Sequence, residues 1–185
     1  MRRVVAAAAL VLAAGAAAGG GKMIVDFSAG ATGWPSIDDS VMGGVSQSSM
    51  KVISGVGVFS GMVSFDNNGG FASVRSRPER RDLSAYSGLL LRVRGDGKRY
   101  GFRLRTDDAF DGVSYQAVLH PLAGEWTEVA LKFADFEPVY RGRRVARHPA
   151  LDPSRITTMG LIISRQEGPF RLEIESIRGL AETQS

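Results

Sequence analysis

The chain has 185 residues, of which 44% are hydrophobic and 23% are charged, and this is ordinary for one globular domain with a proper core. It has no cysteine, which excludes disulfides, a thiol nucleophile and a cysteine-based zinc site. The formal net charge is +4, and without Arg2 and Arg3 it falls to +2. A bulk charge this small does not favour nucleic acid as a partner.

Residues 1–22 have the three parts of a secretory signal peptide in order: a basic start, an apolar run from Val4 to Ala18, and small residues before Gly19. The run is too short for a comfortable membrane span, so no transmembrane anchor is expected after its removal. This pattern predicts an exported protein, either periplasmic or secreted. The alternative is that Met23 is the true first residue, which predicts a cytoplasmic protein.

From Met23 onward the hydrophobic residues alternate with a period of two, and no segment has a long amphipathic helical stripe. This pattern predicts an all-β fold, an antiparallel β-sandwich of the jelly-roll type, as a single domain over residues 23–180 with a tail at 181–185. Residues 137–153 show no clear pattern and are expected to form a loop. The expected strands are 23–27, 46–53, 56–64, 71–75, 89–94, 100–106, 114–119, 126–133, 159–164 and 170–177.

Two glycine-rich stretches, 38–46 and 67–73, are not phosphate-binding loops, because no Lys-Ser/Thr pair or helical pattern follows the glycines. A Gly-Gly step instead permits positive φ and a close approach of two backbones. Asp38 and Asp39 are adjacent and point opposite ways in an extended segment, so they cannot form an acid/base pair, and we expect them to cap backbone amides. The residues expected to build this structural loop are Asp39, Gly43, Gly44, Asn68, Gly69 and Gly70.

Residues 89–94 and 100–106 are expected to pair as a hairpin, with leucine, valine and phenylalanine on its inner face. Like charges that lie opposite each other in a sheet need counter-charge. If the strand 126–133 lies beside this hairpin, Glu128 neutralises part of the outer face and Trp126 covers it. The arginines that alternation places together on that outer face are Arg92, Arg94, Arg103 and Arg105.

Two interpretations of this basic face remain open. It is suited to an anionic ligand or an acidic protein surface, which arginine binds well. Alternatively it is a solvated surface whose arginines pair with Asp107, Asp108 and Asp111.

A carbohydrate site needs exposed aromatic side chains with polar groups beside them. Tyr100 and Trp126, in the neighbourhood of Arg94 and Arg103, are the first choice for such a cleft. Packing in the core is an equally good explanation for Trp126.

Groups for catalysis or metal binding are sparse, and we expect no enzyme, no cofactor and no metal site. His120 and His148 lie far apart in the sequence without a ligand-spaced partner, and no serine lies in a Gly-x-Ser-x-Gly elbow. Asp26 and Glu175, on the first and last strands, are an alternative calcium pair, for which ordinary edge-strand carboxylates are the preferred interpretation.

The chain resembles the complex I intermediate-associated protein 30 family, with motifs in the family's order from about residue 24 to residue 178. These motifs are Asp39-Ser40-Val41-Met42-Gly43-Gly44-Val45-Ser46, Phe59-Ser60-Gly61, Asn68-Gly69-Gly70-Phe71-Ala72-Ser73-Val74-Arg75, Leu91-Arg92-Val93-Arg94-Gly95-Asp96-Gly97 with Tyr100, Gly124-Glu125-Trp126, and Gly168-Pro169-Phe170 with Leu172 and Ile174.

The resemblance implies a galactose-binding-domain-like β-sandwich, the architecture of many carbohydrate-binding modules. It also implies a non-catalytic role as a protein-assembly factor or chaperone-like module, because eukaryotic relatives help to build mitochondrial NADH:ubiquinone oxidoreductase. The expected partner is therefore a protein, such as a respiratory-complex subunit, or a glycan if the chain is exported. RNA is a third and weaker alternative. The residues expected to contact the partner are Arg75, Arg92, Arg94, Asp96, Tyr100, Arg103, Trp126 and Glu128.

Overall fold

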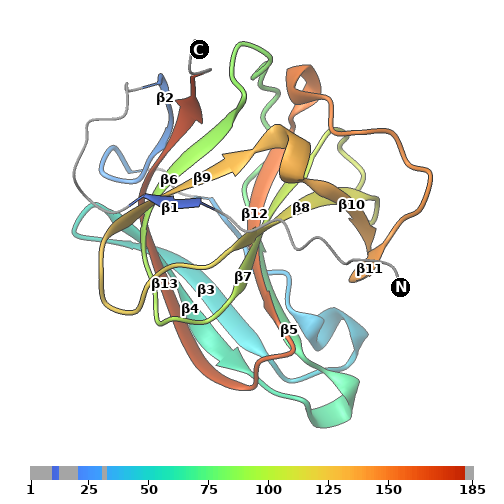
Figure 1. Ribbon diagram of the computed structural model, residues 1–185. Helices are drawn as coiled ribbons and strands as arrows, with labels where there is room; N and C mark the ends of the chain where they lie inside the picture. The colour runs from blue at the N-terminus through green and yellow to red at the C-terminus, as the bar shows by residue number, and fades with distance from the viewer. Residues whose placement is uncertain (1–9, 13–20, 31–32, 182–185) are drawn as a thin grey trace, which may run out of the picture.

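The computed structural model describes residues 10–12, 21–30 and 33–181, which form two antiparallel sheets packed face to face (Figure 1). Sheet A has seven strands in the order β1-β9-β6-β13-β4-β3, with β2 also on β13. Sheet B has six strands in the order β11-β10-β8-β7-β12-β5. The predicted all-β sandwich is confirmed.

The strands of sheet A are β1 (Leu10–Leu12), β2 (Met23–Asp26), β3 (Gln47–Ile53), β4 (Val56–Val63), β6 (Gly88–Arg94), β9 (Thr127–Lys132) and β13 (Gly168–Leu180). Those of sheet B are β5 (Phe71–Arg75), β7 (Tyr100–Arg105), β8 (Ser114–Leu119), β10 (Glu137–Tyr140), β11 (Arg143–Arg144) and β12 (Thr158–Ser164).

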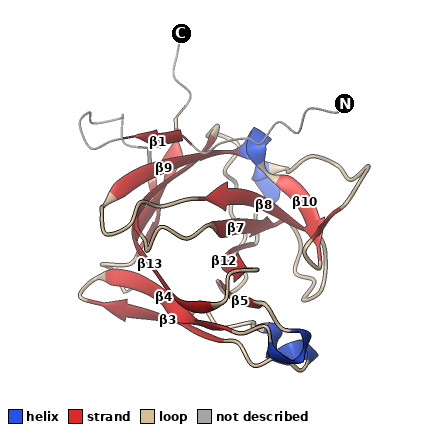
Figure 2. Ribbon diagram, turned by 60° about the horizontal axis from the view of Figure 1, so that its bottom comes forward, coloured by secondary structure: helices blue, strands red, loops and turns tan. Residues whose placement is uncertain are grey.

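The helical segments are single 3-10 turns at the ends of the sandwich (Figure 2). Within the described residues, no helix has the length and apolar character needed to cross a membrane. The turns are η1 (Asp39–Met42), η2 (Asp66–Asn68), η3 (Phe133–Asp135) and η4 (Pro153–Arg155).

The core lies between the sheets and follows from side-chain alternation. Leu89, Leu91 and Val93 of β6 point inward from sheet A, and Phe102 and Leu104 of β7 point inward from sheet B. All of these side chains are fully buried, as the alternation predicts. Burial of apolar side chains of this size is the dominant stabilising contribution in such a fold.

The predicted hairpin between residues 89–94 and 100–106 is wrong. Strand β6 lies in sheet A between β9 and β13, and β7 lies in sheet B between β8 and β12. The connection is not a tight hairpin turn, because Gly95 bonds to the backbone of Leu122 and Gly124 and so carries the chain from one sheet to the other. The outward arginines of β6 and β7 therefore lie on opposite outer faces of the sandwich.

The segment 137–153, expected to be a loop, contains two short strands at one side of sheet B, β10 and the edge strand β11. Strand β10 pairs with β8 through Glu137, Pro138 and Val139. Proline has no amide N–H to donate, but a short strand near the edge of a sheet tolerates it. The presence of Pro138 therefore argues against a strand in the sequence pattern without preventing one from forming.

The predicted signal peptide and C-terminal tail lie largely outside the described residues, and the division of the chain into leader, domain and tail stays a prediction. Within the leader, the backbone of Leu10–Leu12 pairs with β9.

Candidate functional site

Asp39 ties two distant loops together at one end of the sandwich. This side chain is fully buried, and its carboxylate accepts hydrogen bonds from the Ser46 amide at 2.9 Å and the Ser46 hydroxyl at 2.6 Å. It also accepts bonds from the amides of Gly70 at 2.7 Å and Phe71 at 3.2 Å. One carboxylate therefore holds the segment after η1 against the start of β5.

Asp38 makes a similar set of bonds on the other side of the same segment. Its carboxylate accepts bonds from the Ser48 amide at 2.8 Å, the Ser48 hydroxyl at 2.6 Å and the Ser73 amide at 2.9 Å. The prediction that Asp38 and Asp39 cap backbone amides is confirmed. The amides lie in β3 and β5 or directly before them, so the two aspartates join the edge of sheet A to the edge of sheet B.

The glycines around Asp39 leave room for its carboxylate. A Cβ atom on Gly44 would lie 2.3 Å from Asp39 Oδ1, and one on Gly69 would lie 2.6 Å from Asp39 Oδ2. Gly43 meets a different need, because its φ of +88° lies in the left-handed region where it ends η1. The remaining members of the predicted structural loop, Asn68 and Gly70, also have positive φ.

The hydrogen bonds to Asp39 favour its charged form. Burial by itself would raise the pKa of this carboxyl, but the bonds from Ser46, Gly70 and Phe71 outweigh burial and hold the pKa below its usual value. The carboxylate is therefore a charged structural clamp.

On the outer face of sheet A, the arginines are neutralised by glutamates of β13. Arg92 pairs with Glu175 at 2.6 Å, Arg94 with Glu173 at 2.5 Å, and Arg171 with Glu173 at 2.7 Å. Burial would raise the pKa of Glu173, but Arg171 and Arg94 outweigh burial and lower it. This face corresponds to the solvated, self-paired interpretation, although the acidic partners are not the predicted aspartates.

Trp126 packs against the same two arginines of β6. Its ring centroid lies 5.7 Å from Cζ of Arg92 and 4.9 Å from Cζ of Arg94, within the range of cation–π contacts. Glu128 lies directly opposite Arg92 in the strand register. The predicted neighbourhood of Glu128 is therefore present, although the ion pair that Arg92 forms within the described residues is with Glu175.

Tyr100 and Asp96 are structural residues near the end of the sandwich. Tyr100 is 2% exposed, and its hydroxyl donates to Asp96 Oδ1 at 2.9 Å. Burial and the Asp96 charge raise the pKa of this phenol well above its usual value. Asp96 Oδ2 accepts a bond from the Arg171 amide at 2.9 Å.

The predicted aromatic cleft is therefore wrong. Tyr100 lies in the core, Trp126 and Arg94 lie on the outer face of sheet A, and Arg103 lies on the outer face of sheet B. Strand alternation correctly predicts that each of these arginines points outward. The error lies in the expected pairing of residues 89–94 with residues 100–106, which belong to different sheets.

The remaining candidate groups already have local partners. Asp26 Oδ1 accepts bonds from the Ser28 amide and hydroxyl, and Glu175 pairs with Arg92. His120 contacts the Gly97 carbonyl, and His148 contacts the Tyr115 hydroxyl.

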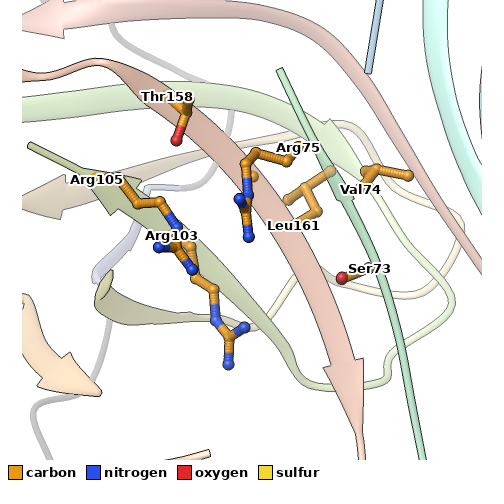
Figure 3. Close-up of a pocket in the computed structure, with 8 residues that line it drawn as sticks. Ser73, Val74, Arg75, Arg103, Arg105, Thr158 and Leu161 are labelled. Carbon is orange, nitrogen blue, oxygen red and sulfur yellow. The ribbon is translucent and has the colours of Figure 1, made fainter. Parts of the chain in front are cut away.

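Three arginines come together on the outer face of sheet B. Arg75 of β5 and Arg103 of β7 are both register partners of Gly160 on the intervening β12, and Arg105 is the register partner of Thr158. Because Gly160 has no side chain, the space between Arg75 and Arg103 stays open. Figure 3 shows the three arginine side chains together near Thr158 and Leu161 of β12. Arg75, Arg103 and Arg105 are called the arginine cluster below.

The arginine cluster has neutral hydrogen-bond acceptors. Arg75 donates to the Phe110 carbonyl at 3.1 Å, Arg103 to Gln116 Oε1 at 2.8 Å, and Arg105 to the Ala109 carbonyl at 3.2 Å. Within the residues that the structure describes, none of the three forms an ion pair. Most of their N–H donors therefore have no hydrogen-bond partner within the described residues.

Burial and mutual repulsion weaken the charged forms of the cluster. Burial, followed by the charge of Arg105, lowers the pKa of Arg75 to about 10. Burial, followed by the charges of Arg105 and Arg75, lowers the pKa of Arg103 to about 10. Burial also lowers the pKa of Arg105, against the opposing charges of Asp107 and Asp111. A bound anion would relieve this repulsion.

Two hollows that share lining residues lie at the cluster. A small one of about 20 Å³ is lined by the three arginines together with Ser73, Thr158 and Gly160. A larger one of about 210 Å³ begins at Arg75, Arg105 and Thr158 and continues along the loop after β7. The apolar residues that line the larger hollow are Pro35, Ile37, Pro78, Ala109 and Phe110.

The motifs around Asp39 and the outward arginines belong to a sequence that matches a known family. The sequence model of the Complex I intermediate-associated protein 30 family matches residues 25–174. The chain belongs to this family.

Family members from animals and a fungal protein are among its relatives. The Complex I intermediate-associated protein 30, mitochondrial, of Drosophila melanogaster is 30% identical over 145 residues, which are 66% of this chain and 49% of the relative. An uncharacterized protein of Schizosaccharomyces pombe is 29% identical over 60% of this chain and 58% of the relative. The mouse family member is 33% identical over 52% of this chain and 31% of the relative. The chain thus spans about half the length of the first two relatives.

Carbohydrate-binding modules share the family's fold. A family 11 module of a Clostridium thermocellum cellulase superposes with a TM-score of 0.70 at 18% identity, covering 90% of this chain and 98% of the module. A structure of the family 11 module in complex with a β-1,3-1,4-mixed-linked tetrasaccharide has a TM-score of 0.66 at 19% identity, covering 89% and 98%. At these identities the likeness establishes the fold alone.

Sequence reasoning missed the assembly of the cluster and its hollow. Arg75 and Arg103 were each candidates, but the strand that joins them, β12, comes from much later in the chain. Phe110 lies in a loop with no periodic pattern, so no local signal marked it as a neighbour of Arg75.

Proposed function

We propose that this chain is a non-catalytic binding domain whose arginine cluster on sheet B holds an acidic segment of a protein partner. One observation carries the proposal. The outward arginines of β6 are paired with Glu173 and Glu175, whereas the arginine cluster has neutral acceptors and no ion pair within the described residues.

The physical argument is that grouped cations need a counter-charge. Half-buried guanidinium groups beside one another repel, and each loses part of its hydration. A carboxylate accepts two parallel N–H bonds from one guanidinium, and such charge-assisted bonds are about twice as strong as neutral ones. Binding an acidic segment would therefore remove a cost that the free domain carries at Arg75 and Arg103.

A role in protein assembly fits the family. The Drosophila and mouse relatives are named as Complex I intermediate-associated proteins, and we infer that this domain likewise binds a protein subunit during assembly. A non-catalytic role is supported by the surroundings of the two histidines. In the described part of the chain, His120 contacts a backbone carbonyl and His148 contacts Tyr115 and Pro149, so neither activates a serine.

The names of the relatives indicate in which cellular compartment the partner is found. Those from Drosophila and mouse are named mitochondrial, which favours an internal partner over an exported role. Sequencing of the N-terminus of the native protein tests this choice: a start at Met23 supports the internal role, and a start at Gly19 contradicts it.

Glycan binding is the alternative suggested by the fold, since the solved relatives include modules named for carbohydrate binding. The outward residues of β5, β12, β7 and β8 include no tryptophan or tyrosine, although neutral sugars are usually held by stacking on aromatic rings. We therefore expect a β-1,3-1,4-linked tetrasaccharide not to bind.

Fluorescence anisotropy with a labelled oligoglutamate peptide tests the proposal on the full chain. The double substitution Arg75→Gln and Arg103→Gln is expected to reduce affinity at least about tenfold, and raised salt is expected to weaken binding of the wild type. The matched control is Arg92→Gln with Arg94→Gln on sheet A, which should leave affinity within about twofold. Equal losses in the two double variants, or no binding by the wild type, would overturn the proposal. Single-stranded RNA bound more tightly than the peptide would do the same.

A further inference from the structure

The arginine cluster lies beside an apolar hollow. Arg75, Arg105 and Thr158 line both the small space among the guanidinium groups and the larger one of about 210 Å³. The guanidinium of Arg75 also lies 5.5 Å from the centroid of the Phe110 ring. The side chain of Arg75 therefore belongs both to the arginine cluster and to the wall of the apolar hollow.

The hollow is suited to a single apolar side chain. Pro35, Ile37, Pro78 and Phe110 give it walls of mostly carbon atoms, and Phe110 is 68% exposed. At about 210 Å³ it is smaller than the clefts of about 300–1,000 Å³ that hold drug-sized ligands. It is large enough to remove a bulky side chain from water, which is favourable in proportion to the apolar area buried.

The charges around the hollow favour a negative group on the arginine cluster and not in the hollow itself. Asp107 and Asp108 line the hollow beside the arginines, and Asp111 lies close enough to stabilise the charge of Arg75. Asp111 is itself bound to Arg141 and Tyr140. A phosphate or carboxylate placed in the hollow would meet these carboxylates, whereas a carboxylate on the arginine cluster would avoid them.

We propose that the arginine cluster and this hollow together recognise a carboxylate with a bulky apolar side chain next to it in a peptide. This inference rests on the proposed function, because it specifies which acidic segments the same face selects. Arg75 and Arg103 bind the carboxylate, and the neighbouring side chain enters the hollow between Ile37 and Phe110. The carboxylate is the side chain of an aspartate or glutamate in the acidic segment.

Titration calorimetry of the full chain with short peptides in a Gly/Ser background provides the test. A Glu-Phe peptide is expected to bind at least about tenfold more tightly than either a Glu-Ala or a Gln-Phe peptide. A peptide ending in phenylalanine with a free carboxylate, compared with its amidated form, distinguishes a side-chain carboxylate from a C-terminal one. Binding of the Glu-Phe peptide supports the side-chain carboxylate, and binding of the free-acid form alone would overturn the inference.

A variant that fills the hollow isolates its contribution. Ala109→Trp is expected to remove the preference for Glu-Phe over Glu-Ala while leaving Glu-Ala binding within about twofold. The matched control is Ala134→Trp, at an exposed alanine of η3, which should retain the preference. Circular dichroism of each variant checks that the fold is retained.

The outcomes separate this inference from the function on which it rests. Equal affinity for Glu-Phe and Glu-Ala peptides overturns the inference and leaves the acidic-segment proposal standing. If no carboxylate peptide binds, oligoglutamate included, both the inference and the acidic-segment proposal are overturned. A preference for Glu-Phe that survives Ala109→Trp places the apolar contact elsewhere and also overturns the inference.

Discussion

Arg75 and Arg103 lie on either side of Gly160 in one register row of sheet B, with no side chain between them. Both are held by neutral acceptors, and burial together with neighbouring arginines lowers the pKa of each to about 10. The opposite outer face shows the contrasting arrangement, in which Arg94 and Arg171 share the carboxylate of Glu173. The difference between these faces has measurable consequences for stability and binding.

Arg103→Gln is expected to stabilise the free protein by about 0.5–2 kcal/mol, because it removes a half-buried charge that two other arginines repel. The new amide can still donate to Gln116. Urea unfolding at pH 7 measures the effect. Arg94→Gln is the comparison, and it should destabilise the protein because Glu173 loses a partner. A loss of stability in Arg103→Gln would show that the cluster does not carry unrelieved repulsion.

Glu173→Gln is expected to cost about 2–3 kcal/mol, because Arg94 and Arg171 both lose their acidic partner at a side chain that is only 9% exposed. Glu175→Gln should cost less than about 1 kcal/mol, since that side chain is 44% exposed and pairs with Arg92 alone. Chemical unfolding of the two variants measures the difference. Equal costs would contradict the view that Glu173 is the main counter-charge of sheet A.

Asp39→Asn is expected to lower the free energy of unfolding by roughly 2–3 kcal/mol at pH 7, because the buried carboxylate binds several backbone and hydroxyl donors. The control is Asp66→Asn, at an exposed side chain of η2, which should change stability by less than about 0.5 kcal/mol.

The contribution of Asp39 should also depend on pH. Its folded-state pKa lies below the usual value of 3.8, so the unfolded state binds more protons in acid. The stabilisation is therefore complete above pH 3.8 and is lost as the pH falls through the folded-state pKa. Unfolding curves from pH 7 downward should show the gap between wild type and Asp39→Asn narrowing below about pH 4. A constant gap would mean that the charge of Asp39 does not contribute.

Gly44→Ala is expected to cost more than about 2 kcal/mol, because its Cβ would lie 2.3 Å from an Asp39 oxygen that several bonds hold in place. Gly43→Ala should cost only about 1–2 kcal/mol, since its Cβ meets no atom within 4 Å and the penalty comes from φ of +88° alone. Thermal unfolding of both variants gives the order. The reverse order would contradict the tight fit of Asp39 against Gly44.

Sequence alternation predicted the strands and the directions of their side chains. Leu91 and Phe102 are buried and Arg92 and Arg103 point outward, as a period of two requires. The capping role of Asp39 was also predictable, because aspartate in a turn commonly binds backbone amides.

The partners of each strand were not predictable from the same pattern. Alternation specifies which face a residue occupies and says nothing about the neighbouring strand. The connection after Arg94 has the composition of a hairpin turn, yet it crosses to the other sheet because Gly95 bonds to the segment around Leu122. The insertion of β12 between β5 and β7 depends on the packing of the whole domain, so the meeting of Arg75 with Arg103 had no local signal.

Chemical-shift mapping of the full chain by NMR, during titration with a Glu-Phe peptide, tests the central claim most directly. The account predicts that the largest amide shifts fall on Ser73–Arg75 of β5, Arg103–Arg105 of β7 and Thr158–Gly160 of β12, and that they vanish in the Arg75→Gln, Arg103→Gln double variant. Shifts centred on Trp126 and Arg94 of sheet A, or shifts unchanged in that variant, would contradict it.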